Sequence, residues 1–142
     1  MILLDTNVVS EGWKPQPSAA VVSWLDAQPA GSLFLCTPVL AELRYGVERL
    51  PDGRRKRRLA AWVDHLEGEI YRDQILGLDT VAAAAFGRLA ARRERLGRRM
   101  EPVDALIAGI AASQGAAIAT RETSDFDDLG IELINPFDAP PR

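Results

Sequence analysis

The feature of the sequence that most constrains the fold is a regular alternation of short apolar runs with segments long enough to form helices. Strands are expected at residues 1–4, 33–36, 74–78, 116–119 and 131–134. Helices are expected between them, at residues 18–27, 37–50, 54–66, 80–96 and 102–114. Parallel strands need long crossovers, so this order predicts an α/β fold with a parallel sheet and helices on both faces.

The length and composition predict one domain and exclude several kinds of site. With 142 residues, 47% of them hydrophobic, the chain fits one globular domain over residues 1–137 followed by a short tail, residues 138–142. A single cysteine, Cys36, excludes an internal disulfide, and with the single histidine, His65, it cannot form a Cys/His zinc site. Neither a signal peptide nor a membrane segment is recognised, so a cytoplasmic location is expected.

Acidic residues recur where the expected strands end. Asp5 directly follows the first strand, and Glu42 lies in the helix after the second. Asp104 lies in the first turn of the helix that Pro102 opens, and Glu122 and Asp125 follow the fourth strand. Ligand sites of parallel α/β sheets lie beyond the carboxyl ends of the strands, so these acids are expected to converge there.

Two interpretations of these acids remain open from the residues alone. Carboxylates that crowd together repel one another unless a cation holds them, and a donor set of oxygens only indicates Mg²⁺ or Mn²⁺. Such a site typically acts on phosphate esters through a metal-activated water. Taken singly, however, each acid has an ordinary role: Asp5 as a turn or cap residue, Glu42 as a solvated helix residue and Asp104 as a first-turn acid.

Two other Mg²⁺-binding α/β folds fit the sequence poorly. A receiver domain has an acidic pair after the first strand and a lysine after the last. Here Asp5 is followed by Thr6 and Asn7, and the only lysines, Lys14 and Lys56, come early. A haloacid-dehalogenase-type phosphatase has a second aspartate two residues after the first, where this chain has Asn7.

Four segments of the chain together resemble one known family. They are MILLDTNVVSE at residues 1–11, TPVLAELRYGVERL at 37–50, EPVDALIAGIAASQGAAIATRETSDF at 101–126 and GIELINPF at 130–137. In their order and separation they resemble the VapC-type PIN-domain toxins, and most closely the FitB-like subgroup. The resemblance covers essentially the whole chain.

The resemblance implies a fold, an activity and partners. The fold would be a single PIN-like domain with a five-stranded parallel sheet. The activity would be Mg²⁺-dependent single-strand endoribonuclease, with Mn²⁺ as the other candidate metal. The partners would be an RNA substrate, a cognate antitoxin and a second copy of the chain, with DNA reached only through the antitoxin and no membrane. The alternative is a PIN-like module that acts mainly by binding protein, without nuclease activity.

The resemblance also implies roles for residues. Asp5, Glu42 and Asp104 match the invariant acids around the metal, with Asp5 and Asp104 as direct ligands. The segment Thr120–Phe126 departs from the family pattern, so the fourth acid is Glu122 or Asp125, and we favour Glu122. Glu42 and Glu122 would bind through water or position the attacking hydroxide. The supporting residues would be Thr6, Asn7, Thr120 and Asp125, with ordinary turn and cap roles as the alternative for Thr6, Asn7 and Thr120.

The charge is unevenly distributed. The net charge is −3, but without four site carboxylates 16 acids remain against 17 bases. The bases cluster in two stretches, which are expected to flank the acidic site and hold an RNA backbone. A solvated helix face and docking of an acidic antitoxin tail are the alternatives. The first stretch is Arg54, Arg55, Lys56, Arg57 and Arg58, and the second is Arg92, Arg93, Arg95, Arg98 and Arg99.

Overall fold

The computed structural model describes residues 1–138 and confirms the predicted parallel α/β architecture. Five strands form one sheet in the order β3-β2-β1-β4-β5, and each neighbouring pair is parallel. This order places β1 in the centre, so the residue after β1 emerges in the middle of the carboxyl edge. The strands are β1 (Ile2–Leu4), β2 (Leu33–Cys36), β3 (Ile75–Leu76), β4 (Ala117–Ala119) and β5 (Leu133–Ile134).

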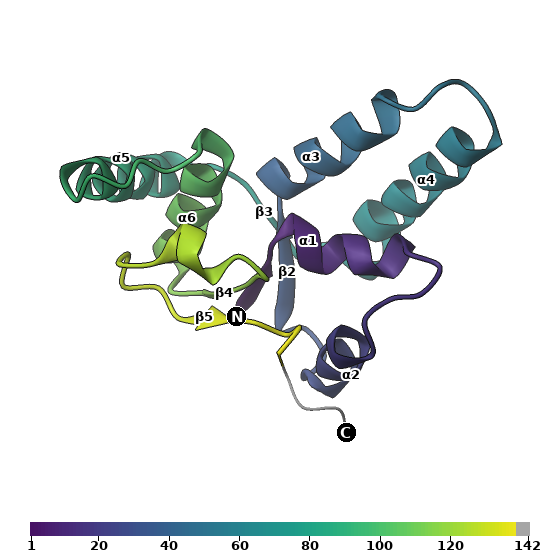
Figure 1. Ribbon diagram of the computed structural model, residues 1–142, viewed down its shortest axis with the longest axis horizontal. Helices are drawn as coiled ribbons and strands as arrows, with labels where there is room; N and C mark the ends of the chain where they lie inside the picture. The colour runs from purple at the N-terminus through teal and green to yellow at the C-terminus, as the bar shows by residue number, and fades with distance from the viewer. Residues whose placement is uncertain (139–142) are drawn as a thin grey trace.

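Helices connect the strands that follow one another in the chain, with one exception. β4 and β5 are connected by a 3₁₀ turn, η3 (Thr123–Phe126). Figure 1 shows α5 and α6 on one side of the strands and α1 to α4 on the other. The helices are α1 (Thr6–Val9), α2 (Ala19–Ala27), α3 (Thr37–Glu48), α4 (Arg54–His65), α5 (Thr80–Arg95) and α6 (Pro102–Gln114). Two further turns, η1 (Ser10–Trp13) and η2 (Leu66–Ile70), continue α1 and α4.

The edge strands are shorter than the apolar runs predict. The run at residues 74–78 pairs only over Ile75–Leu76, and the run at residues 131–134 only over Leu133–Ile134. Both strands lie at an edge of the sheet, where one neighbour alone supplies ladder hydrogen bonds. The helix expected at residues 37–50 begins at Thr37, with Cys36 at the N-cap position, and ends two residues early at Glu48.

A short helix directly after β1 is absent from the sequence prediction. α1 begins at Thr6, and the Asp5 side chain caps it by accepting a hydrogen bond from the Thr6 backbone N–H at 2.8 Å. Val8 and Val9 are buried in this helix, although valine favours strands. Burial against the core therefore outweighs local preference here, and the helix fixes the direction of the Asp5 carboxylate.

The close approach of α5 and α6 sets the position of Asp104. A Cβ on Gly109 of α6 would lie 2.8 Å from the Ala82 carbonyl oxygen and 2.9 Å from the Phe86 nitrogen of α5. Only a residue without a side chain fits at this contact. α6 ends at Gly115, whose φ of 63° is the left-handed conformation that favours glycine after a helix.

The described residues bear on two further expectations. Within residues 1–138, none of the helices has the length and apolar character needed to cross a bilayer. Of the expected tail, residues 139–142 lie outside the described part of the chain.

Candidate functional site

The register of the sheet brings Asp5 and Thr120 together. Leu4 of β1 pairs with Ala119 of β4, so the residues that follow them leave the sheet side by side. The Asp5 backbone N–H donates to the Ala119 carbonyl at 2.9 Å, and the Thr120 hydroxyl donates to Asp5 Oδ2 at 2.8 Å. Asp5 is 7% exposed and Thr120 is fully buried. The Asp5 carboxylate is therefore held between two strand ends.

Asn7 strengthens this connection between the two strand ends. Its side-chain amide donates to Thr120 Oγ1 at 3.3 Å and makes a longer contact, 3.4 Å, with Asp5 Oδ2. Its amide oxygen accepts from the Arg121 backbone N–H at 3.1 Å. Thr120 Oγ1 in turn accepts from the Glu122 backbone N–H at 3.0 Å. Of the four expected supporting residues, Thr6, Asn7 and Thr120 thus donate hydrogen bonds to Asp5.

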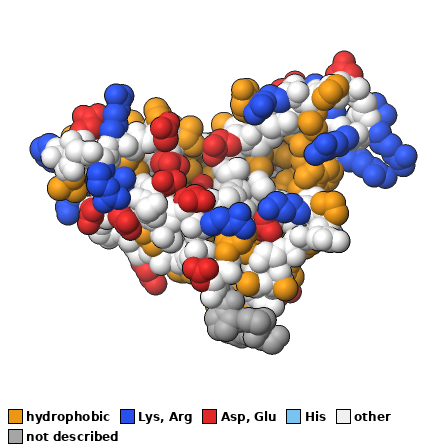
Figure 2. All heavy atoms as spheres, viewed as in Figure 1, with side chains coloured by type: hydrophobic (Ala, Val, Ile, Leu, Met, Phe, Trp, Pro, Cys, Tyr) orange, Lys and Arg blue, Asp and Glu red, His pale blue; other side chains and the backbone are white. Residues whose placement is uncertain are grey.

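Glu42 and Asp104 reach the same edge of the sheet from two helices. Glu42 is exposed on α3, and its Oε1 accepts a hydrogen bond from the Thr6 hydroxyl at 2.5 Å. Asp104 is half-buried in the first turn of α6, which favours a negative charge. Figure 2 shows acidic side chains gathered near the middle of one face, where the α6 and α3 sides of the molecule meet.

The acids raise one another's pKa values. Burial, followed by the charges of Asp5, Asp125, Glu42 and Glu101, raises the pKa of Asp104 to about 7. Burial also raises the pKa of Asp5, against the hydrogen bonds from Thr120 and Thr6, and the charges of Glu42 and Asp125 add to the increase. All of the charges that shift these two pKa values belong to carboxylates. The charges that act on these two acids thus concentrate negative charge at this edge of the sheet.

The donor chemistry fits a hard divalent cation, although the side chains do not close around one. Among residues 1–138, no three histidine, cysteine or acidic side chains stand close enough together to hold an ion as they are. Mg²⁺ keeps several of its waters and commonly takes only one or two protein carboxylates, so it does not need a closed cage. Asp5 and Asp104 could hold such an ion directly, with the other acids reaching it through water.

The two candidates for the fourth acid differ in their electrostatic effect on the site. Asp125, at the third position of η3, is among the charges that raise the pKa values of both Asp5 and Asp104, and Glu122 is not. Glu122 is exposed, and it meets the site through its backbone N–H, which donates to Thr120. This electrostatic contribution favours Asp125 as the fourth acid, whereas the sequence favours Glu122, and the choice between them stays a prediction.

The first basic stretch is not beside the acids. Arg54, Arg55, Arg57 and Arg58 are exposed in the first turns of α4, at the far tip of the α3–α4 hairpin in Figure 1. Figure 2 shows Lys and Arg side chains gathered at that end of the molecule. Lys56 is turned back instead, 3.5 Å from Asp52 and 3.8 Å from Glu48.

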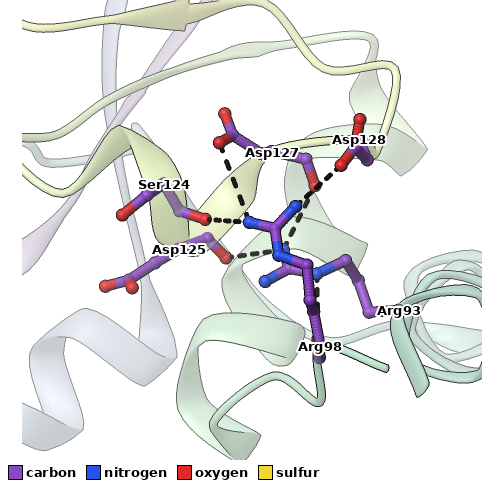
Figure 3. A network of polar contacts seen from close by, with 6 residues as sticks. All are labelled: Arg93, Arg98, Ser124, Asp125, Asp127 and Asp128. Atoms are coloured by element: carbon purple, nitrogen blue, oxygen red, sulfur yellow. Dashed lines mark hydrogen bonds and ion pairs between the residues drawn. The ribbon is translucent and has the colours of Figure 1, made fainter. Parts of the chain in front are cut away.

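The second basic stretch does not form the uniform surface that the sequence predicts. Arg93 is buried, 5% exposed, and donates hydrogen bonds to three backbone carbonyls. Arg98 binds the segment that carries Asp125 (Figure 3). The expectation that Arg93 faces RNA or solvent is wrong, because its guanidinium group is buried against backbone carbonyls, whereas the Arg98 side chain is 42% exposed and pairs with Asp128. The sequence carries no signal for this, since both stand in a run of similar arginines.

Known proteins resemble this chain in sequence. The PIN-domain family model matches residues 2–132. The VapC ribonuclease Y4jK of Sinorhizobium fredii is 38% identical over 141 residues, which cover 97% of this chain and 99% of the relative. Toxin FitB of Neisseria gonorrhoeae is 34% identical over 137 residues, covering 96% of this chain and 99% of the relative.

The fold comparison agrees with the sequence comparison. The solved structure of FitAB bound to an IR36 DNA fragment contains a chain that matches with a TM-score of 0.91 at 32% identity. The match covers 99% of this chain and 98% of that one. The chain described here therefore belongs to the PIN-domain family, in the group that includes the VapC and FitB proteins.

Proposed function

We propose that this chain is the toxin of a toxin–antitoxin pair and that it cleaves single-stranded RNA with the help of Mg²⁺ or Mn²⁺. The observation that carries the proposal is the set of acids at the carboxyl edge of the sheet, from four separate segments of the chain, whose charges raise the pKa values of Asp5 and Asp104. Bringing these carboxylates together in the folded protein is unfavourable, because they repel one another, unless the working site binds a cation. The names of its relatives, a VapC ribonuclease and toxin FitB, support the same function.

The residues divide the work between holding the metal and positioning groups around it. Asp5 and Asp104 are the direct ligands in this proposal, and Glu42 and Asp125 act through water. A bound divalent ion would supply an activated water and neutralise charge on the scissile phosphate. Thr6 orients two of the acids, because its backbone N–H donates to Asp5 and its hydroxyl donates to Glu42. Thr120 fixes the other oxygen of Asp5.

The proposed partners are an antitoxin, a second copy of the chain and RNA. The solved FitAB relative is bound to a DNA fragment, which is consistent with DNA being contacted through the antitoxin. The exposed arginines at the start of α4 are candidates for binding RNA or an acidic antitoxin segment. They lie at a helix N-terminus, where the helix dipole disfavours positive charge, so they do not serve the stability of α4.

The direct test is cleavage of a labelled single-stranded RNA by the purified chain. Mg²⁺-dependent cleavage that chelation abolishes is expected from the wild type. Asp5→Asn and Asp104→Asn should fold and lose it, because each removes a negative ligand at constant volume. Full cleavage by either variant at matched metal concentration contradicts the proposed site.

A second test distinguishes a nuclease from a module that only binds protein. Calorimetric titration with Mn²⁺ should show binding to the wild type and much weaker binding to Asp104→Asn. In cells, mapping of RNA 5′ ends after induction should show new ends with the wild type and none with Asp5→Asn. A chain that binds a partner but neither Mn²⁺ nor RNA supports the protein-binding alternative.

A further inference from the structure

Arg93 is a buried cation whose hydrogen bonds all go to backbone. Its Nε donates to the Arg98 carbonyl at 3.0 Å, and its Nη1 donates to the carbonyls of Asp125 and Asp127 at 3.0 and 3.1 Å (Figure 3). A buried charge is costly unless hydrogen bonds replace its hydration. Here that replacement comes largely from the segment that follows β4. The arginine of α5 is thus fastened to the loop that carries Asp125.

Arg98 fastens the same segment from outside. Its Nη1 lies 2.8 Å from Asp128 Oδ2, and its Nη2 donates to the Ser124 carbonyl at 3.2 Å. Its side chain is 42% exposed, so this contact borders solvent. Together the two guanidinium groups hold the carbonyls of Ser124 and Asp125 in η3 and of Asp127 directly after it.

The backbone carbonyl and the side-chain carboxylate of Asp125 point in different directions. In Figure 3 its carbonyl points to Arg93, while its carboxylate lies on the opposite side, away from both guanidinium groups. The charge of that carboxylate acts on Asp5 and Asp104. The arginines therefore hold the backbone of Asp125 without neutralising its side chain. The next residue, Phe126, is buried in the core and anchors the turn.

We propose that Arg93 and Arg98 are positioning residues, which set the place of the Asp125 carboxylate in the acid cluster and thereby the affinity of that cluster for a divalent cation. This inference rests on the proposed function and assigns to α5 a part in the site. Arginine is required at position 93, because its fork reaches carbonyls of two different segments, residue 98 and residues 125–127. A lysine ammonium keeps the charge and does not reproduce this geometry.

A double-mutant cycle separates positioning from general stabilisation. Arg93→Lys, Asp125→Asn and the double variant are compared with the wild type by calorimetric titration with Mn²⁺ and by RNA cleavage. Each single change is expected to weaken Mn²⁺ binding by about 10-fold or more, the usual cost of removing a group that orients a metal site. If Arg93 acts through Asp125, the double variant is no weaker than Asp125→Asn. Losses that multiply in the double variant overturn the proposal.

A second variant and a control cover the case in which Arg93→Lys does not fold. Arg98→Ala changes a partly exposed side chain, and the same cycle with Asp125→Asn is expected to give the same pattern. The control is Arg88→Ala, which removes the same charge from an exposed position of α5 and is expected to keep wild-type Mn²⁺ affinity. An equal loss of affinity in Arg88→Ala would attribute the effect to net charge and overturn the proposal.

The outcomes also distinguish this inference from the proposed function. A wild type that binds Mn²⁺ and cleaves RNA, with folded Arg93→Lys and Arg98→Ala matching it in both, overturns the positioning role alone. A wild type that neither binds Mn²⁺ nor cleaves RNA overturns both proposals.

Discussion

At the scale of single residues, Asp104 shows how the site acts against the stability of the fold. Burial and four neighbouring carboxylates raise its pKa from 3.8 to about 7. The folded chain thus binds a proton there more tightly than the unfolded chain does. Asp104 therefore does not destabilise the fold at pH values below its unfolded pKa. Its destabilising effect grows as the pH rises and reaches its full size above about pH 7.

This pKa predicts a pH-dependent gain from Asp104→Asn. Without divalent metal, the variant should be more stable than the wild type at pH 8, by at most about 4 kcal/mol, because it removes the buried charge. The gain should shrink as the pH falls towards 4. Urea unfolding across this range measures it, with Asp26→Asn on α2 as a control for the amide replacement at an exposed acid. A wild type that is the more stable at pH 8 without metal contradicts the prediction.

Removal of the Thr120 hydroxyl is expected to lower stability through the loss of hydrogen bonds alone. Its hydroxyl donates to Asp5 and accepts from the Asn7 amide and the Glu122 N–H, all at a fully buried position. Thr120→Val keeps the shape and removes these bonds, so it should destabilise the protein by about 1–3 kcal/mol. Thr120→Ser keeps the hydroxyl and should retain RNA cleavage that Thr120→Val loses. Chemical unfolding and the cleavage assay check the pair, and equal behaviour of the two variants argues against the role of the hydroxyl.

At the scale of elements, the packing of α5 against α6 decides where two site residues stand. α6 carries Asp104 in its first turn, and α5 carries Arg93, which holds the Asp125 segment. Gly109 lets the two helices approach, since a Cβ there would meet backbone atoms of Ala82 and Phe86 at 2.8–3.0 Å. A shift between these helices would move two of the acids relative to Asp5.

Gly109→Ala is therefore expected to destabilise the protein by about 1–3 kcal/mol, as overpacking against backbone does. It should also weaken Mn²⁺ binding, because α6 must move. The matched control is Gly87→Ala on α5, where a Cβ meets nothing within 4 Å. That change should be neutral or stabilising by up to about 1 kcal/mol, since alanine favours helices over glycine. Thermal unfolding compares the two, and a Gly109→Ala variant as stable as the wild type would show that the helices can separate at no cost.

The elements also show how far the sequence predicts this site. The apolar runs, Pro102 and Gly115 allow strand and helix boundaries to be predicted from the sequence. The convergence of Asp5, Glu42 and Asp104 at one edge of the sheet could be predicted for that reason. The sequence cannot decide between Glu122 and Asp125, because the choice depends on how a single 3₁₀ turn presents its residues. The role of Arg93 is hidden for a related reason: burial of one arginine among five depends on helix α5 facing the loop after β4.

At the scale of the whole molecule, charge is separated along its length. Acids gather near the middle of one face, and exposed arginines gather at the tip of the α3–α4 hairpin (Figure 2). An RNA that reaches the acids has a phosphate backbone that these acids repel. A basic surface at a distance can offset this repulsion by holding a neighbouring part of the strand.

This separation predicts the salt dependence of RNA binding. Replacing the exposed Arg54, Arg55, Arg57 and Arg58 by glutamine should weaken binding of single-stranded RNA, because fewer phosphates are then neutralised by the protein. The slope of log affinity against log salt should flatten by about 0.7 for each phosphate that is no longer neutralised. Lys56 is left in place, since it is paired with Asp52 and Glu48. Binding is measured on an Asp5→Asn background, so that cleavage does not interfere.

The control for this prediction removes charge elsewhere. Arg88→Gln with Arg92→Gln and Arg95→Gln neutralises three exposed arginines on α5, and a smaller change of slope is expected. If the hairpin variant keeps the wild-type slope, the arginines at the start of α4 do not bind phosphate. The helix dipole would still disfavour these arginines at the N-terminus of α4. Binding of a protein partner with an acidic segment would then account for their placement. Retained RNA binding together with a failure to bind the antitoxin would identify that occupant directly.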